Sequence, residues 1–175
     1  MSRSTAAQNH LVGLGRVSGA HGIRGAVKVR ADAEAATTDP EVFAALGEVW
    51  IGGQSFRVLE AGRHKSQVVL QLAEVDTRSR AETLVGLAVQ GDRRRFPPLP
   101  EGEYYWFQVL GLPVVNVADG SLLGYLEEII PTPAHDVYVV RAGEQEVLLP
   151  AVEEVIVEIS LEEGLIRAAP LEGLL

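Results

Sequence analysis

Short apolar runs, rich in β-branched residues and separated by glycine, make up the first half of the chain. This pattern is typical of β-strands joined by tight turns rather than of long helices. Six such strands with short connections predict a small closed or nearly closed barrel. The predicted strands are Leu11–Val17, Ala26–Arg30, Glu48–Ile51, Phe56–Ala61, Gln67–Leu72 and Leu87–Gln90.

Two short helices are expected to interrupt these strands. The first, Pro40–Leu46, follows Asp39, which is a suitable N-cap, and proline fits the first turn of a helix. The second is predicted over Arg78–Val85, with Asp76 or Thr77 as its cap. A glycine follows each of the two segments and is expected to end the helix there.

A proline-rich break comes next, and after it the strand pattern starts again. The second set of predicted strands is Pro113–Val117, Ser121–Ile130, Asp136–Arg141, Glu146–Leu149, Val155–Ile159 and Gly164–Ala168. We therefore expect a mainly β protein with two small β-barrel domains and a few short helices. The expected parts are a mobile N-terminal arm over residues 1–10, a first domain over 11–96, a linker over 97–102 and a second domain over 103–175.

The composition indicates the cellular compartment in which the protein acts. The chain has no cysteine, which excludes disulfides and thiolate chemistry and fits a reducing compartment. Its polar first residues lack the apolar stretch of a signal peptide, and no apolar run approaches the length of a membrane span. These features predict a cytoplasmic protein that does not associate with membranes.

The charge is divided unevenly between the two halves. Residues 1–95 carry 13 Lys and Arg against 10 Asp and Glu, whereas residues 96–175 carry 2 against 14. The first half, at +3, could lie near RNA phosphates, while the second half, at −12, would repel RNA and attract a basic protein. Alternatively, the acidic residues simply keep the second domain soluble.

A glycine-rich segment, Gly19–Gly25, connects the first two predicted strands. Three glycines in seven residues indicate positive φ angles or a close approach of the backbone to a neighbour. A phosphate-binding P-loop needs Lys and Ser or Thr after its last glycine, but Ala26 and Val27 follow here. A dinucleotide-binding fingerprint starting at Gly13 and Gly15 is also excluded, because Ser18 stands where its third glycine would be.

Two side chains of this segment, His21 and Arg24, have no evident role in the turn itself. His21 could bond the turn backbone while Arg24 makes a surface ion pair. Alternatively, both could contact RNA phosphate or a ribosomal partner, with help from the neighbouring Lys28 and Arg30.

A run of four aromatic residues, Tyr104–Phe107, stands out in a chain that has two Trp, four Tyr and four Phe. Successive side chains point in different directions in both helices and strands, so the run cannot be buried on a single face. Part of it should fill a core, and part should face solvent or a partner. Exposed Tyr and Trp are common anchors of protein–protein contacts.

No residue pattern points to an enzyme. The four histidines are scattered without the close spacing of a metal-binding pair, and no nucleophile turn is present. Adjacent glutamates such as Glu127-Glu128 diverge in a strand and fit a solvated surface better than a catalytic pair. We therefore predict no catalytic residue, no metal site and no cofactor.

Segments spread over nearly the whole chain after residue 10 carry a family resemblance. Their order and spacing resemble the RimM family of bacterial factors for maturation of the small ribosomal subunit. The matching segments are Gly15–Val29, His64-Lys65, Val75-Asp76, Ala81–Gly86, Glu103–Trp106, Leu110–Leu112, Asp136–Val140, Leu148–Pro150 and Glu172–Leu175.

The resemblance implies a six-stranded N-terminal barrel similar to those of translation elongation factors and certain reductases, followed by a PRC-type barrel. It also implies binding to ribosomal protein uS19 of the small-subunit head, with assistance to pre-30S head assembly and 16S rRNA processing. Tyr104 and Tyr105 match the family positions implicated in that binding. We accordingly expect Tyr104 and Tyr105 to be exposed, with Trp106, Phe107 and Leu110 buried.

The sequence departs from the family pattern at two places. Phe107-Gln108 stands where the family usually has His-Asp, and the loop Pro131–Asp136 lacks the usual Gly and Asn. An alternative function is that of a direct rRNA-binding module acting through the basic first domain, with weak and salt-dependent affinity. We expect a monomer. The candidate residues for ribosome or RNA contact are His21, Arg24, Lys28, Arg63 and Lys65.

Overall fold

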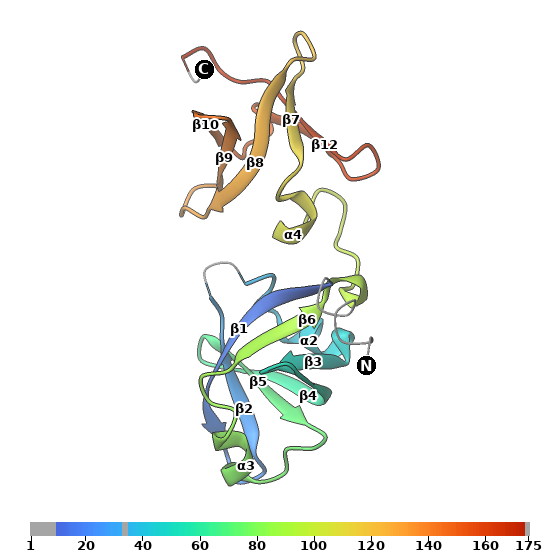
Figure 1. Cartoon of the computed structure of the whole chain (residues 1–175), viewed down its shortest axis with the longest axis vertical. Helices are drawn as coiled ribbons and strands as arrows, with labels where there is room; N and C mark the ends of the chain where they lie inside the picture. The colour runs from blue at the N-terminus through green and yellow to red at the C-terminus, as the bar shows by residue number, and fades with distance from the viewer. Residues whose placement is uncertain (1–9, 33–34, 174–175) are drawn as a thin grey trace. The chain divides into compact units, whose positions relative to one another are not determined.

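The computed structural model describes residues 10–32 and 35–173, and most of the predicted N-terminal arm lies outside these ranges. The chain divides into two compact units, with the boundary along the sequence between Leu99 and Pro100 (Figure 1). Each unit has a hydrophobic core of its own.

The first unit is a closed six-stranded barrel, as predicted, with strand order β1-β2-β5-β4-β3-β6. Its buried face is built from Val, Leu, Ile and Phe side chains that alternate along the strands with outward-facing residues. The strands are β1 (Leu11–His21), β2 (Ala26–Arg30), β3 (Glu48–Ile51), β4 (Gln54–His64), β5 (Gln67–Leu72) and β6 (Ala88–Asp92).

Strands β1 and β4 run further than the sequence pattern predicts. The end of β1 pairs His21 with Ala26, and the end of β4 pairs His64 with Gln67. Both extensions carry polar residues, so hydrophobic alternation does not indicate them, but the hairpin partners continue the hydrogen-bonded ladder. The two extensions bring His21 and His64 to the outside of the barrel.

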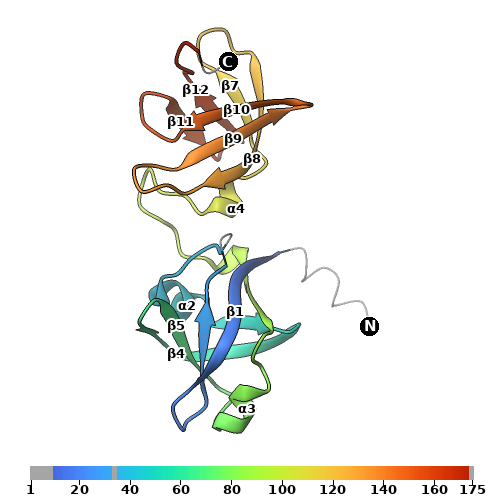
Figure 2. The ribbon, with the colours of Figure 1, turned by 90° about the vertical axis from the view of Figure 1, so that its left-hand side faces the viewer.

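The helices of the first unit begin where their caps predict. Helix α2 (Pro40–Leu46) starts after Asp39, whose Oδ1 accepts a hydrogen bond from the amide of Glu41 at 2.9 Å. Helix α3 (Arg78–Glu82) starts after Thr77, whose Oγ1 accepts from the amide of Arg80 at 3.2 Å. Helix α3 ends at Glu82, earlier than predicted, and it lies beside the turn that joins β1 to β2 (Figure 2).

The second unit is a six-stranded sheet with strand order β10-β9-β8-β7-β12-β11. Its neighbours are antiparallel except for β12 and β7, which are parallel. The short helix α4 (Trp106–Val109) of this unit was not predicted, and neither was the 3₁₀ turn η1 (Arg93–Arg95) at the end of the first unit. The strands are β7 (Pro113–Asn116), β8 (Leu122–Ile130), β9 (Val137–Ala142), β10 (Gln145–Pro150), β11 (Ile156–Ser160) and β12 (Leu165–Ala168).

Candidate functional site

The aromatic run Tyr104–Phe107 leads into helix α4. Tyr104 is half-buried against the core of the second unit, and its hydroxyl donates a hydrogen bond to the carbonyl of Ile159 at 3.1 Å. Ile159 lies on β11, an edge strand of the sheet, so this hydroxyl satisfies a carbonyl at an edge. The Tyr105 ring stacks on the Phe107 ring with centroids 5.3 Å apart and planes inclined by 6°.

The prediction that Tyr104 and Tyr105 are exposed is wrong, whereas Trp106 packs against the core of the second unit as predicted, although it is only half-buried. Tyr105 is the most buried member of the run, at 5% exposure, and the other three are half-buried. The chain changes from extended backbone at Tyr105 to helix at Trp106, so neither periodicity applies across the run. Leu110, also expected to be buried, is exposed.

Glutamine at position 108, one of the departures from the family pattern, holds the start of α4. The Gln108 Oε1 atom accepts a hydrogen bond from the amide of Tyr105 at 2.9 Å. This bond satisfies an amide that has no partner inside the helix. Gln108 therefore stabilises the backbone of the aromatic run.

Tyr138 lies near this run on the core side of β9. Burial of its ring raises the pKa of the Tyr138 phenol, and the negative charge of Asp136 raises that pKa further. The phenol is consequently neutral at physiological pH. Tyr104 and Tyr138 both pack against the hydrophobic core of the second unit, so the predicted contact residue Tyr104 also has a structural role.

The opposite face of β8, β9 and β10 forms a second candidate surface, which we call the acidic face. Leu126 and Val140, paired in the register, point into the core, so their neighbours along the strands point outward. The acidic face consists of Glu127, at a bulge in β8, and three cross-strand rows: Tyr125–Arg141–Glu146, Glu128–Val139–Leu148 and Ile130–Val137–Pro150. Within the middle row Val139 is covered, at 2% exposure.

Exposed apolar side chains and carboxylates are mixed on the acidic face. Leu148 is 47% exposed, and Tyr125 and Ile130 are also exposed. The guanidinium of Arg141 is already engaged, with Nη1 3.0 Å from Glu127 Oε2 and Nη2 2.6 Å from Glu146 Oε2. These contacts raise the pKa of Arg141. Glu127, Glu128 and Glu146 outnumber the single Arg141, so the face has a net charge of −2.

In the first unit, the turn between β1 and β2 is fixed by its glycines. Gly22 and Gly25 have φ angles of 74° and 76°, the left-handed region predicted from the glycine motif. A Cβ atom on Gly25 would collide with the backbone of Thr77, the cap of α3. The glycine motif thus serves both a turn and a close backbone approach.

A side chain from β5 also clamps this turn. The Nε2 atom of Gln71 donates hydrogen bonds to the carbonyl oxygens of Arg24 and Val75, each at 3.0 Å. At the tip of the turn, Ile23 is 89% exposed. The clamped turn thus presents an apolar side chain at a tip where polar residues are more common.

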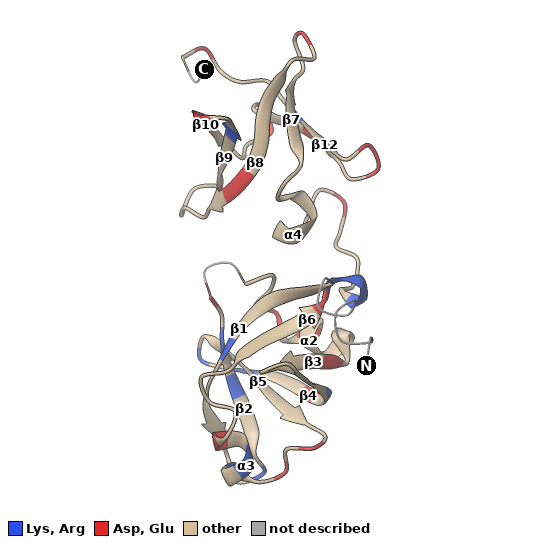
Figure 3. Cartoon of the chain, viewed as in Figure 1, with Lys and Arg blue, Asp and Glu red and all other residues tan. Residues whose placement is uncertain are grey.

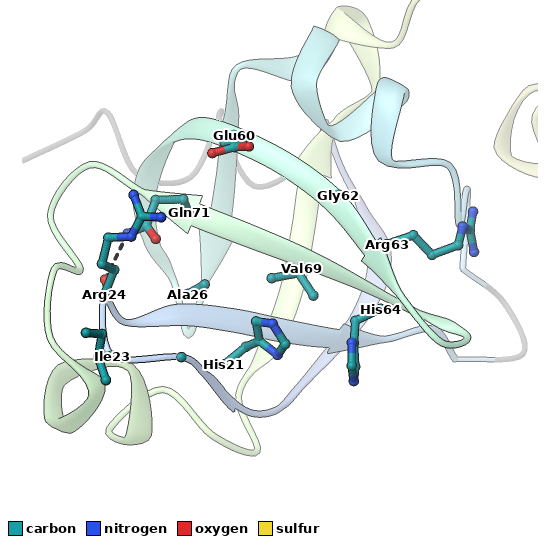
Figure 4. Close-up of a pocket in the computed structure, with 11 residues that line it drawn as sticks. His21, Ile23, Arg24, Ala26, Glu60, Gly62, Arg63, His64, Val69 and Gln71 are labelled. Carbon is teal, nitrogen blue, oxygen red and sulfur yellow. Dashed lines mark hydrogen bonds between the residues drawn. The ribbon is translucent and has the colours of Figure 1, made fainter.

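Beside the turn lies a hollow of about 500 Å³ on the outer surface of β2, β5 and β4 (Figure 4). The rings of His21 and His64 meet there, with centroids 4.8 Å apart and planes inclined by 50°. Ala26, Gly62 and Val69 form part of its lining, and Figure 4 shows Arg24 and Gln71 away from the two histidines. We call this site the histidine hollow.

The five predicted contact residues are only partly brought together. His21 and Arg24 line the histidine hollow, and Arg63 lines it while its Nη2 donates to the carbonyl of Thr38 at 2.9 Å. Figure 4 shows the Arg63 guanidinium pointing away from the histidines. Lys28 lies opposite Val69 in the register, and Lys65 lies in the turn after β4, but neither lines the hollow.

Sequence reasoning missed His64, Gln71 and Ile23 as site residues. His64 and Gln71 come from β4 and β5, and their place in the hollow depends on barrel closure and strand register. Ile23 could have been noticed from the sequence alone, as the apolar residue inside a glycine-rich turn.

Within residues 10–32 and 35–173, no three His, Asp or Glu side chains gather in a way that could hold a metal ion. In the same ranges, no helix has the length and apolar character needed to cross a bilayer.

The fold and the sites define a two-domain β-barrel protein whose candidate sites lie on its surface. The first unit has the histidine hollow, and the second has the acidic face. The Lys and Arg residues concentrate in the first unit, as Figure 3 shows. The chain belongs to the RimM family. Residues 12–96 match the RimM N-terminal domain, and residues 106–174 match the RimM PRC barrel domain.

Similar proteins cover nearly the whole chain. A ribosome maturation factor RimM from Geobacter metallireducens is 39% identical over 170 residues, covering 94% of this chain and 95% of the relative. One from Symbiobacterium thermophilum is 41% identical over 171 residues, covering 94% of both. The solution structure of the N-terminal domain of RimM from Thermus thermophilus is 28% identical and covers 51% of this chain and 98% of that domain, with a TM-score of 0.42.

Proposed function

We propose that this protein is a ribosome maturation factor of the small subunit that acts by binding rather than by catalysis. It binds ribosomal protein uS19 and assists assembly of the pre-30S head and processing of 16S rRNA. Membership of the RimM family and the shared name of its relatives support the maturation role. The binding of uS19 is the finer part of the proposal, and it rests on the character of the second unit.

The acidic face is the observation that carries this proposal. Ribosomal proteins such as uS19 are basic, and a complementary acidic surface speeds and orients their association. The face also offers exposed Tyr125 and Leu148, and tyrosine is among the residues that most often carry the affinity of a protein interface. A surface that served only solubility would not need exposed apolar residues among its carboxylates.

Tyr104 and Tyr105 have different parts in this proposal. Tyr104 contacts uS19 through the part of its ring that remains exposed, while its hydroxyl stays bonded to Ile159. Tyr105 acts through Phe107, since its ring has 5% exposure and stacks on that neighbour. Tyr105 is therefore a positioning residue in the contact rather than an exposed anchor.

Calorimetric titration of the full chain with purified uS19 tests the acidic face. Reversing two charges with Glu127→Lys and Glu128→Lys should weaken binding at least tenfold, because a like-charge contact costs several kcal/mol. The matched control reverses Glu153 and Glu154, an exposed pair of the same unit outside the acidic face. A control that weakens binding as much as the test pair would show that only net charge matters, and the acidic face would then be the wrong surface.

A second pair of variants tests the apolar contribution. Leu148→Ala should weaken uS19 binding several-fold, whereas Val157→Ala, at a comparably exposed residue of β11, should leave it unchanged. If neither the charge reversals nor Leu148→Ala changes the affinity, uS19 does not bind this face.

A further inference from the structure

We propose that the histidine hollow of the first unit binds one unpaired nucleotide of a single-stranded RNA segment. This inference rests on the proposed role in ribosome maturation, because that role supplies the RNA. It concerns a nucleotide within a strand and not a free mononucleotide, for which the glycine turn lacks the required motif.

The shape of the hollow follows from the strand register. Lys28, Val69 and Gly62 stand side by side on β2, β5 and β4, with Val69 opposite both of the others. Their neighbours Val27, Val68 and Leu70 are buried in the core, so this row faces outward. Gly62 has no side chain, and a Cβ atom added there would meet nothing within 4 Å. The missing side chain at Gly62 therefore leaves space for a ligand in the hollow.

The walls offer a flat ligand something to stack on. The rings of His21 and His64 are held 4.8 Å apart by the ends of two different strands. Unstacked RNA bases are commonly bound by stacking on aromatic rings, including histidine, and on arginine guanidinium groups. The exposed side chain of Ile23 adds apolar contact area at the rim. A hollow of about 500 Å³ is large enough for one nucleotide.

Basic side chains lead along the barrel surface toward the hollow. Arg16 and Arg30 are directly opposite each other on β1 and β2, and Lys28 lies on the same outer face of β2. Arg24 lies in the turn that borders the hollow and adds a further positive charge there. A strip of this kind can follow the phosphates of a single strand, while a nucleotide in the hollow is read by its base.

Two polar lining residues give the hollow acceptors for base edges. Glu60 is opposite Gln71 in the register, and both line the hollow. The Nε2 group of Gln71 donates to the carbonyl oxygens of Arg24 and Val75. Its Oε1 atom is therefore the part of the side chain that can accept a hydrogen bond from a base. Carboxylate and amide oxygens accept hydrogen bonds from exocyclic amino groups of bases. A carboxylate in the lining disfavours a bare phosphate, which is why we assign the hollow to a base-bearing nucleotide.

Fluorescence anisotropy with the full chain and a labelled mixed-sequence RNA octamer tests the proposal. Gly62→Val should fill the hollow and weaken binding of the single strand about tenfold, the scale of one lost base stack. Gly13→Val is the matched control, because a Cβ atom at Gly13 also meets nothing within 4 Å and this residue lies outside the hollow. The same RNA annealed to its complement should bind more weakly than the single strand.

Three further variants keep the test decisive. Arg24→Ala, on the surface of the turn, should weaken binding and reduce the slope of log affinity against log salt by about one. His64→Phe should retain most of the affinity, since it keeps a ring for stacking, whereas His64→Ala should lose about tenfold. Should Gly62→Val fail to fold by circular dichroism, Arg24→Ala and the two His64 variants decide the matter.

The outcomes separate this inference from the proposed function. Gly62→Val and His64→Ala should bind uS19 like the wild type, because the histidine hollow and the acidic face belong to different units. Unchanged single-strand affinity in both variants, or equal affinity for the duplex, would overturn the inference and leave uS19 binding untouched. If the wild-type protein does not bind uS19, the proposed function is overturned, and the RNA result is unaffected.

Discussion

Asp92 shows how one carboxylate stabilises the end of the first barrel. It is the last residue of β6, and its Oδ1 accepts from the amide of Arg94 at 3.0 Å, which caps the 3₁₀ turn η1. The Arg94 guanidinium lies against the same carboxylate, with Nη2 2.7 Å from Oδ2. The hydrogen bond from Arg94 lowers the pKa of Asp92, although partial burial of the carboxylate opposes the shift.

We predict a stability difference that depends on pH. Asp92→Ala removes the cap and should destabilise the first unit by about 1 kcal/mol at pH 7. Asp92→Asn keeps an acceptor oxygen and should cost less. Since the folded-state pKa is lowered, the carboxylate stabilises the protein above its unfolded pKa, about 4, and this contribution disappears as the pH falls through the folded value. Urea unfolding of both proteins at pH 7 and pH 3 measures the difference in their free energies of unfolding. A difference between wild type and Asp92→Asn that is the same at both pH values would contradict the prediction.

The two glycines of the β1–β2 turn allow a matched comparison. Gly22→Ala should cost about 1 kcal/mol, because it imposes a left-handed conformation on alanine while its Cβ meets open space. Gly25→Ala carries the same conformational cost and adds a collision with the backbone of Thr77. We expect it to be the more destabilising by at least about 2 kcal/mol. Thermal unfolding of both variants checks this order, and equal losses would mean that the turn can move away from α3.

At the scale of elements, the sequence predicted most strands and both capped helices, because each has a local signal. Strand alternation and the caps Asp39 and Thr77 depend only on neighbouring residues. Helix α4 was missed because four residues are too few to show a helical period. That omission also explains the wrong exposure of Tyr104 and Tyr105, since the run crosses from extended chain into this helix.

The candidate sites were predictable only where one segment supplies them. His21 and Arg24 were found because they lie inside the glycine motif. His64 and Gln71 reach the hollow through strand pairing between distant segments, so a single sequence does not place them there. The acidic face was visible as net charge, but its three rows follow from the register of β8, β9 and β10.

The hydroxyl of Tyr104 gives a prediction for the edge of the second sheet. Tyr104→Phe removes the hydrogen bond to the Ile159 carbonyl and should destabilise the second unit by about 1 kcal/mol. Tyr104→Ala removes the ring as well and should cost about 3 kcal/mol, because the ring packs against the core. Both values come from denaturant unfolding. In the proposed function Tyr104→Phe retains uS19 binding, so a large loss of affinity would show that the hydroxyl itself contacts the partner.

At the scale of the whole molecule, charge and architecture divide at the same place. The first unit carries the basic strip and the histidine hollow, and the second carries all of the excess negative charge. An acidic surface and an RNA-binding surface on one small barrel would weaken each other through their opposite fields. If both proposals hold, placing the two surfaces on separate units lets one chain bind a basic protein and an RNA segment.

This division predicts that each unit folds without the other. Residues 1–99 and residues 100–175 each enclose a core, with Phe43 and Leu70 fully buried in one and Leu126 and Ile166 in the other. Expressed separately, each fragment should unfold in urea as a single cooperative transition, because a closed core is the basis of two-state behaviour. The first fragment should retain RNA binding and the second uS19 binding, the latter weakening as salt is raised. A fragment that remains unfolded, while the full chain unfolds in one transition, would show that the two units are a single cooperative body.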